Sequence, residues 1–272
     1  MNGENSKPLV NYHSHTWRCK HAGGTEEEYI RRAIDAGYRV FGFADHSPWP
    51  YPGGFESGIR MRLEQFPDYL ATVRALGEKY RGEIFVPVGL ECEAFPAYFG
   101  WLRDFRAEHL DYVILGNHFE LTDESRDNLY FGACTRPEHI RRYVECTVAG
   151  MQTGLFDYVA HADLCCAVYP AFDPECRAAL RDLCAAAKDL DIPLEYNLLG
   201  VRRHDMFRAR GGLGYPCEEF WALAAEAGCK AIVGVDAHEA DQIDCRDLFE
   251  GAWDFLGGLG LEIVPALPGL EG

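Results

Sequence analysis

Two short stretches, far apart in the chain, carry residue types that can bind a metal ion. In the first, VNYHSHT, His13 and His15 stand two residues apart at the end of a short apolar run. In the second, IVGVDAH, Asp236 and His238 have the same spacing after a longer apolar run. Side chains two residues apart in a strand point to the same face, so each stretch can offer two ligands to one ion. If the first and last strands lie side by side, both chain ends supply one site.

Other potential ligands stand where further apolar runs end. His46 follows RVFGFAD, Glu91 follows FVPVGL and His118 follows YVILGN. A single histidine at a strand end is more often a hydrogen-bonded structural residue than a ligand. The joint pattern favours a shared site, because seven of the ten histidines belong to it. The candidate metal ligands are His13, His15, His21, His46, Glu91, His118, His161, Asp236 and His238.

This set of imidazole and carboxylate ligands, without a thiolate, suits zinc, iron or manganese, and the sequence does not choose between them. Zinc usually binds about four ligands in total. The set exceeds that number, so two or three divalent ions are expected. A purely structural zinc site is disfavoured, because such sites are usually closed and cysteine-rich and the chain has no C-x-x-C pair.

The bulk composition limits the partners of the chain. Its 272 residues, 48% of them hydrophobic, are enough for a sizeable core, and a formal net charge of −17 speaks against a nucleic-acid partner. No apolar run approaches the roughly 20 residues of a membrane span. The N-terminal residues lack the apolar core of a signal peptide, so we expect the eleven cysteines to be reduced and the protein to be cytoplasmic. The oligomeric state stays open.

Seven strand-then-helix units follow one another along the chain without a linker-like break in composition. Strict alternation predicts an α/β fold with a parallel sheet and helices outside, either closed as a barrel or open and doubly wound. The closed barrel is favoured, because it brings the first and last strands together and places its chemistry at the carboxyl ends of the strands. The stretch from Leu198 to Tyr215 is expected to be a long loop with a function.

Several motifs together resemble the polymerase-and-histidinol-phosphatase (PHP) superfamily. They are HSH, DHSP, GLE, GNH, HAD and DAH, which contain His13, His46, Glu91, His118, His161 and Asp236. More narrowly, YHSHT, EEY, Arg60-Met61 and Glu195-Tyr196-Asn197 resemble the histidinol-phosphate phosphatases of that superfamily. The resemblance covers nearly the whole chain. It implies a single domain over residues 1–272, folded as a distorted (β/α)7 TIM-like barrel with a trinuclear metal site at the C-terminal ends of the strands.

The same resemblance implies a role for each site residue. One ion is held by His13, His15, Glu91 and Asp236, and Glu91 bridges to a second ion held by His118 and His161. The third ion is held by His21, His46 and His238. Glu91, Asp236 and His238 are also the candidate catalytic residues. Arg202 resembles the family's phosphate-contacting arginine, with Arg60 and Asn197 as further candidates for substrate binding; the alternatives are solvated cations and, for Asn197, a partner of loop backbone.

The implied reaction is the hydrolysis of a small phosphomonoester by a hydroxide that bridges two ions. Ions about 3.5–4 Å apart lower the pKa of a shared water enough to supply this nucleophile. The narrower resemblance implies L-histidinol phosphate as the substrate, a step of histidine biosynthesis. Leu198 and Leu199 depart from the family's small polar residues, so a nucleotide, sugar phosphate or phosphotyrosine is the alternative substrate. A metal-holding barrel without turnover is the alternative from another class of protein.

Overall fold

The computed structural model describes residues 9–272 as an α/β fold. Its strands are β1 (Leu9–Asn11), β2 (Tyr38–Phe41), β3 (Phe43–His46), β4 (Val88–Cys92), β5 (Tyr112–Leu115), β6 (Tyr158–Val159), β7 (Leu194–Asn197), β8 (Lys230–Gly234) and β9 (Glu262–Ile263). Its α-helices are α1 (Glu26–Ala36), α2 (Phe66–Lys79), α3 (Phe99–His109), α4 (Pro137–Met151), α5 (Pro174–Asp189), α6 (Leu198–Ala209), α7 (Glu218–Ala227) and α8 (Arg246–Gly258). No helix among these residues is long and apolar enough to cross a membrane.

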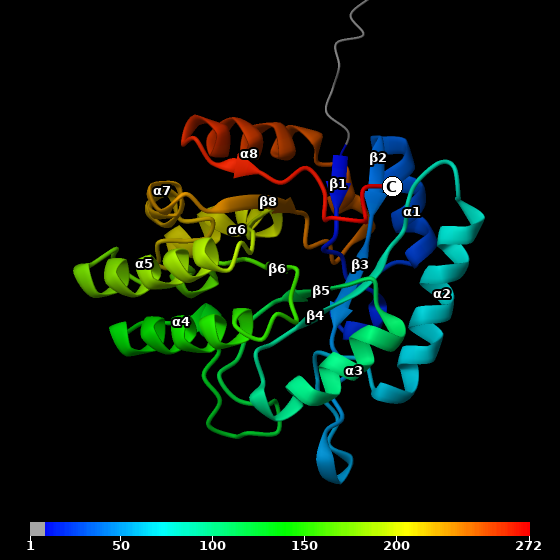
Figure 1. Ribbon diagram of the computed structural model, residues 1–272, viewed down its shortest axis with the longest axis horizontal. Helices are drawn as coiled ribbons and strands as arrows, with labels where there is room; N and C mark the ends of the chain where they lie inside the picture. The colour runs from blue at the N-terminus through cyan, green and yellow to red at the C-terminus, as the bar shows by residue number, and fades with distance from the viewer. Residues whose placement is uncertain (1–8) are drawn as a thin grey trace, which may run out of the picture.

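All the strand pairs are parallel, and the helices lie around the strands, with α1 and α2 on one side and α4, α5 and α7 on the other (Figure 1). One sheet has the order β3-β4-β5-β6-β7-β8-β9, and β1 pairs with β2 in a second sheet. These two sheets share one extended segment, because β2 and β3 are separated by Gly42 alone. The predicted α/β fold with a parallel sheet and outer helices is thereby confirmed.

The chain ends meet at the carboxyl end of the strands. The N–H of His15 donates to the carbonyl oxygen of Ala237 at 2.8 Å, and the N–H of Asp236 donates to that of His13 at 2.9 Å. At the other end of β8, the partner strand is β9 rather than β1. The barrel is therefore distorted: within residues 9–272, backbone hydrogen bonds join the segments after β1 and β8 only at the end that carries the candidate ligands.

The interior of the barrel is filled by a small cluster that includes Tyr12, Tyr112, Tyr158, Ile114 and Ile232. Alternation along the strands produces this cluster: on β5, Tyr112 and Ile114 belong to it, whereas the residues between and after them pack against the helices. The buried hydroxyls have backbone partners. Tyr112 donates to the carbonyl oxygen of Tyr12 at 2.6 Å, and Tyr12 donates to that of Leu270 at 2.8 Å. The C-terminal segment thus closes the end of the barrel opposite the candidate ligands.

The stretch from Leu198 to Tyr215 differs from its prediction. It was expected to be a loop, but its first part forms α6, which begins directly after β7. The side-chain oxygen of Asn197 accepts a hydrogen bond from the N–H of Gly200 at 2.8 Å and so caps this helix. The apolar pair Leu198 and Leu199 is buried in its first turn. The apolar run before Glu91 forms a strand only in its last part, because β4 begins at Val88.

We predict that Gly89→Ala destabilises the barrel. A Cβ at this position would lie 2.5 Å from Cζ of Tyr112, so the ring would have to shift inside a closed core. Overpacking of this kind costs about 1–3 kcal/mol, measured as a lower urea midpoint of unfolding. The matched control is Gly251→Ala in α8, where nothing lies within 4 Å of the added Cβ. Its helix propensity predicts stabilisation of about 0.5–1 kcal/mol. Equal midpoints for both variants would contradict this packing.

Candidate metal centre

The nine candidate ligands converge at the carboxyl end of the barrel. They follow or end β1, β3, β4, β5, β6 and β8, and one comes from the turn after the short 3-10 helix η1 (Trp17–Cys19). Eight of them line a cavity of about 360 Å³: His15, His21, His46, Glu91, His118, His161, Asp236 and His238. The ninth, His13, is fully buried, and its ring centroid lies 5.3 Å from that of His15.

Five imidazole rings surround the carboxylate of Glu91, which is 1% exposed. Three rings face Oε1. The distances from Oε1 to Nε2 of His161, His118 and His13 are 2.8, 3.5 and 3.6 Å, respectively. Two rings face Oε2. The distance from Oε2 to Nδ1 of His46 is 3.0 Å, and the distance from Oε2 to Nε2 of His15 is 3.5 Å. Imidazoles therefore face both oxygens of Glu91. The two sets meet at His13 and His15, whose Nε2 atoms lie 3.3 Å apart and form a possible ligand group with Glu91. A carboxylate in this position would be able to bridge two ions.

A second carboxylate, Asp236, joins the two ends of the chain. Its Oδ1 lies 3.1 Å from Nε2 of His15, 3.4 Å from Nε2 of His13 and 3.5 Å from Nδ1 of His238. Asp236 and His161 have φ angles of 54° and 30°, in the left-handed region. Such conformations cost non-glycine residues about 1–3 kcal/mol and are typical of functional sites. At Asp236 the N–H bond to His13 holds the backbone in this conformation.

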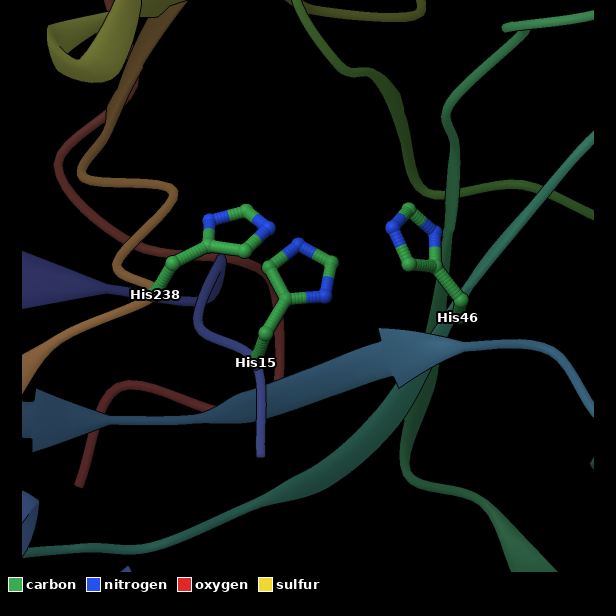
Figure 2. Close-up of side chains that lie close together, drawn as sticks. All are labelled: His15, His46 and His238. Carbon is green, nitrogen blue, oxygen red and sulfur yellow. The ribbon is translucent and has the colours of Figure 1, made fainter. Parts of the chain in front are cut away.

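Three rings of the cluster lie close together at the rim. Figure 2 shows His15, His46 and His238 facing one another from three different segments of the chain. The ring centroids of His15 and His46 are 4.4 Å apart, and those of His15 and His238 are 4.2 Å apart. One ligand atom from each ring lies within 4.8 Å of the others. His21 completes the rim, with its centroid 4.9 Å from that of His238.

Several buried polar atoms of this cluster have no hydrogen-bond partner within the described part of the chain. They are Nδ1 of His15, His46 and His161, and Oε2 of Glu91. Buried polar atoms are nearly always paired, so orphaned nitrogens and an orphaned carboxylate oxygen in one cavity indicate ligand positions. Nitrogen and oxygen donors of this kind suit Zn²⁺, Fe²⁺ or Mn²⁺. The residues therefore fit divalent metal ions.

The electrostatics of the cluster keep its carboxylates ionised but act on its imidazoles in opposite directions. Burial alone raises the pKa of Glu91 and Asp236, but nearby imidazoles, above all His118 and His13, outweigh it and hold both pKa values well below the ordinary range. Burial lowers the pKa of His13, His15 and His118, but the neighbouring carboxylates outweigh it and raise all three, that of His15 to about 9, so these rings must lose a proton when an ion binds. Burial, aided by the charge of His15, lowers the pKa of His238 to about 3. Ionised carboxylates and a neutral imidazole are the forms that coordinate a cation.

Glu195 and Asn197, at the end of β7, contact several candidate ligands through their side chains. Oε1 of Glu195 lies 2.8 Å from Nδ1 of His13, and its Oε2 accepts the N–H of His161 at 2.8 Å. Asn197 donates to the carboxylates of Glu195 at 3.0 Å and Asp236 at 3.1 Å. Carboxylate partners of this kind fix the orientation of metal-binding imidazoles. From its sequence context, Asn197 was a candidate for substrate binding or for a partner of loop backbone, and Glu195 had no assigned role.

Two glycines make room for these carboxylates. A Cβ at Gly116, directly after β5, would lie 1.9 Å from Oε1 of Glu91. A Cβ at Gly234, at the end of β8, would lie 1.7 Å from Oε1 of Glu195. Any larger residue at either position would displace the acid beside it.

Arg60 belongs to the supports of the site. It is 1% exposed and donates to the carboxylate of Glu93, and its Nε donates to Asp123 at 3.0 Å. Glu93 in turn lies 3.0 Å from Nδ1 of His118. Arg60, predicted to bind substrate, does not line the cavity. Arg60 is therefore connected to His118 through Glu93, which was not a candidate from the sequence.

Two neighbouring arginines of α6 lie differently relative to the cavity. Arg202 does not line the cavity, and its guanidinium donates to the carbonyl oxygen of Gln242 at 3.0 Å. Its neighbour Arg203 does line the cavity. The remaining walls are mostly apolar or aromatic: Ile59, Phe119, Tyr130, Leu164, Leu199 and Tyr215. The cavity thus combines metal ligands, a guanidinium and apolar walls, which suits a small phosphorylated organic molecule.

Two curated proteins are similar to this chain over most of its length. The chain is 30% identical over 253 residues to a probable histidinol-phosphatase of Deinococcus radiodurans, covering 88% of this chain and 89% of the relative. It is 25% identical over 258 residues to the histidinol-phosphatase of Bacillus subtilis, covering 85% and 94%.

A solved structure has the same fold. It is histidinol phosphate phosphatase from Lactococcus lactis, complexed with zinc, L-histidinol and phosphate, with a TM-score of 0.68 at 18% identity, covering 94% of this chain and 95% of that one. Residues 11–198 match the family model of the PHP domain. The resemblance found in the sequence is thereby confirmed: the chain belongs to the PHP domain family.

Proposed function

We propose that this protein is a metal-dependent phosphomonoester hydrolase that converts L-histidinol phosphate and water into L-histidinol and phosphate. The observation that carries the proposal is the buried carboxylate of Glu91, with imidazoles facing both of its oxygens, in a 360 Å³ cavity. The relatives named histidinol-phosphatase, and the zinc, L-histidinol and phosphate in the structure from Lactococcus lactis, support the choice of substrate.

The proposed cofactors are two to three divalent ions, zinc, iron or manganese. Oε1 of Glu91 would act with His13, His118 and His161, and Oε2 with His15 and His46. Asp236, His238 and His21 would complete the set on the side of His15. Bound ions supply an activated water and positive charge beside the phosphoryl group. Glu195 and Glu93 hold His13 and His118 in the orientation that this requires.

The substrate would be held by the cavity walls. A guanidinium matches two oxygens of a phosphate group, so we assign Arg203 to the phosphoryl end. The apolar and aromatic walls, among them Phe119, Tyr130 and Leu199, suit the organic end. Leu199, a departure from the family's small polar residues, favours a second candidate function, the hydrolysis of another small phosphoester. The cytoplasmic location and the expectation of no nucleic-acid partner stay predictions, as does the single domain.

A substrate panel tests the proposal. L-histidinol phosphate is expected to have the highest kcat/KM among small phosphomonoesters, including a nucleoside monophosphate, a sugar phosphate and phosphotyrosine. Release of phosphate should stop when a chelator removes the metal and return when Zn²⁺, Fe²⁺ or Mn²⁺ is added. The control is Glu91→Gln, which keeps the size of the side chain but loses the charge. Its kcat/KM should fall by more than about 100-fold. Faster turnover of another ester would identify that ester as the substrate instead. Wild-type activity of Glu91→Gln would contradict the proposed role of Glu91 in holding the ions.

Neighbouring arginines allow a matched test of the phosphate contact. Arg203→Ala should raise KM by about 10- to 100-fold, because a hydrogen bond to a charged group contributes about 1.5–3 kcal/mol. Arg202→Ala should leave KM within about threefold of the wild type, because its guanidinium bonds to Gln242 instead. Steady-state kinetics with L-histidinol phosphate decide between the two. The opposite ranking would return the phosphate contact to Arg202.

A further inference from the structure

Cys19 lies inside the metal centre. It is the last residue of η1 and is fully buried. Its Sγ and one ring nitrogen each of His21 and His238 lie within 4.8 Å of one another. The same sulfur forms a second such group with His15 and Asp45. The ligand set predicted from the sequence contained no thiolate.

The local backbone explains how a thiol and an imidazole two residues apart reach one place. The side chain of Thr16 caps η1 by accepting the N–H of Arg18. Lys20 then adopts a left-handed φ of 71°, and its N–H donates to the carbonyl oxygen of Trp17 at 3.0 Å. Nδ1 of His21 lies 2.8 Å from the carbonyl oxygen of Cys19, which ties the imidazole to the turn. This tight turn brings Sγ of Cys19 close to the ring of His21.

We propose that the thiolate of Cys19 is a ligand of the ion held by His21 and His238. This inference rests on the proposed metal centre and deepens it. On binding, the S–H bond of Cys19 breaks, its proton leaves to solvent, and the sulfur lone pair forms the bond to the ion, as for any coordinating thiol. His21 leaves Nε2 for the ion, because its Nδ1 is engaged by the backbone.

A sulfur ligand would distinguish this position from the one around Oε1 of Glu91. Thiolates are soft ligands that favour zinc, whereas sites of carboxylate and imidazole accept iron and manganese as well. The position at Cys19 should therefore retain Zn²⁺ against exchange with Mn²⁺, and the position at His118 and His161 should exchange more readily. The metal content would then be mixed in a medium that contains both ions.

Buried thiols elsewhere provide a matched control. Cys166 interacts through its thiol with Cys165, Cys176 and Cys217, and it is as buried as Cys19. The cluster of these four thiols is separate from the ligand groups that Cys19 forms with His21 and His238 and with His15 and Asp45. Cys166→Ser therefore tests the effect of losing a buried thiol without touching the centre.

The test uses Co²⁺ in place of the native ions, because cobalt bound to a thiolate has a sulfur-to-metal charge-transfer band in the near ultraviolet. The wild type and Cys166→Ser should show this band, and Cys19→Ser should lose it while still binding cobalt at the remaining positions. In competition with a chelator, the dissociation constant of the weakest-bound Zn²⁺ should be at least about tenfold higher in Cys19→Ser than in the wild type. A cobalt-loaded wild type without the band, or an unchanged band in Cys19→Ser, would overturn the proposal for Cys19 alone.

A measurement that leaves Cys19 unchanged covers the case in which Cys19→Ser fails to fold. X-ray absorption at the zinc edge of Cys166→Ser, which retains Cys19, should detect a sulfur neighbour at about 2.3 Å. A purely nitrogen and oxygen shell in that sample would reject the thiolate ligand. Failure of the wild type to bind any cobalt or zinc would instead reject the metal centre itself, and with it the proposed hydrolase.

Discussion

The burial of Glu91 among imidazoles is the interaction on which the site depends. A carboxylate that is 1% exposed needs compensation, because an unpaired buried charge is very costly. His161, at 2.8 Å from Oε1, supplies part of it. Within residues 9–272, Oε2 receives no hydrogen bond although His46 and His15 lie beside it. Cations on both sides of the carboxylate would satisfy both oxygens and the surrounding ring nitrogens together.

The barrel is arranged so that this carboxylate can be surrounded. Gly116 leaves the space that Glu91 fills, and the left-handed backbone of Asp236 turns a second acid toward His13 and His15. Hydrogen bonds between the segments after β1 and β8 bring the two chain ends together at this rim. The opposite end of the barrel is closed by interior tyrosines and by the C-terminal segment. The tyrosine-rich packing thus lies at one end of the barrel, and the candidate metal ligands lie at the other.

Much of this could be predicted from the sequence, because the ligands stand in short local motifs. The spacing of His13 with His15 and of Asp236 with His238 follows from strand geometry, and a parallel fold places strand ends on one rim. The residue roles that could not be predicted depend on contacts between segments far apart in the chain. Arg60 was a plausible substrate ligand until the structure buried it against Glu93 and Asp123.

The arginines after β7 show the same limit. In an assumed loop, the resemblance favoured Arg202 as the phosphate contact over its neighbour Arg203. In α6, consecutive side chains point about 100° apart, so one meets Gln242 and the other the cavity. Cys19 was overlooked for a similar reason: no pattern in the sequence indicates that the left-handed turn at Lys20 brings its sulfur to the histidines.

Anomalous X-ray scattering from crystals grown with Zn²⁺ tests the central claim most directly, because it locates the ions relative to Glu91. The account predicts anomalous peaks on both sides of this carboxylate, one about 2.0–2.2 Å from Oε1 and another at the same distance from Oε2. A zinc-loaded crystal with no peak beside Glu91, or with peaks on one oxygen alone, would contradict a bridging carboxylate.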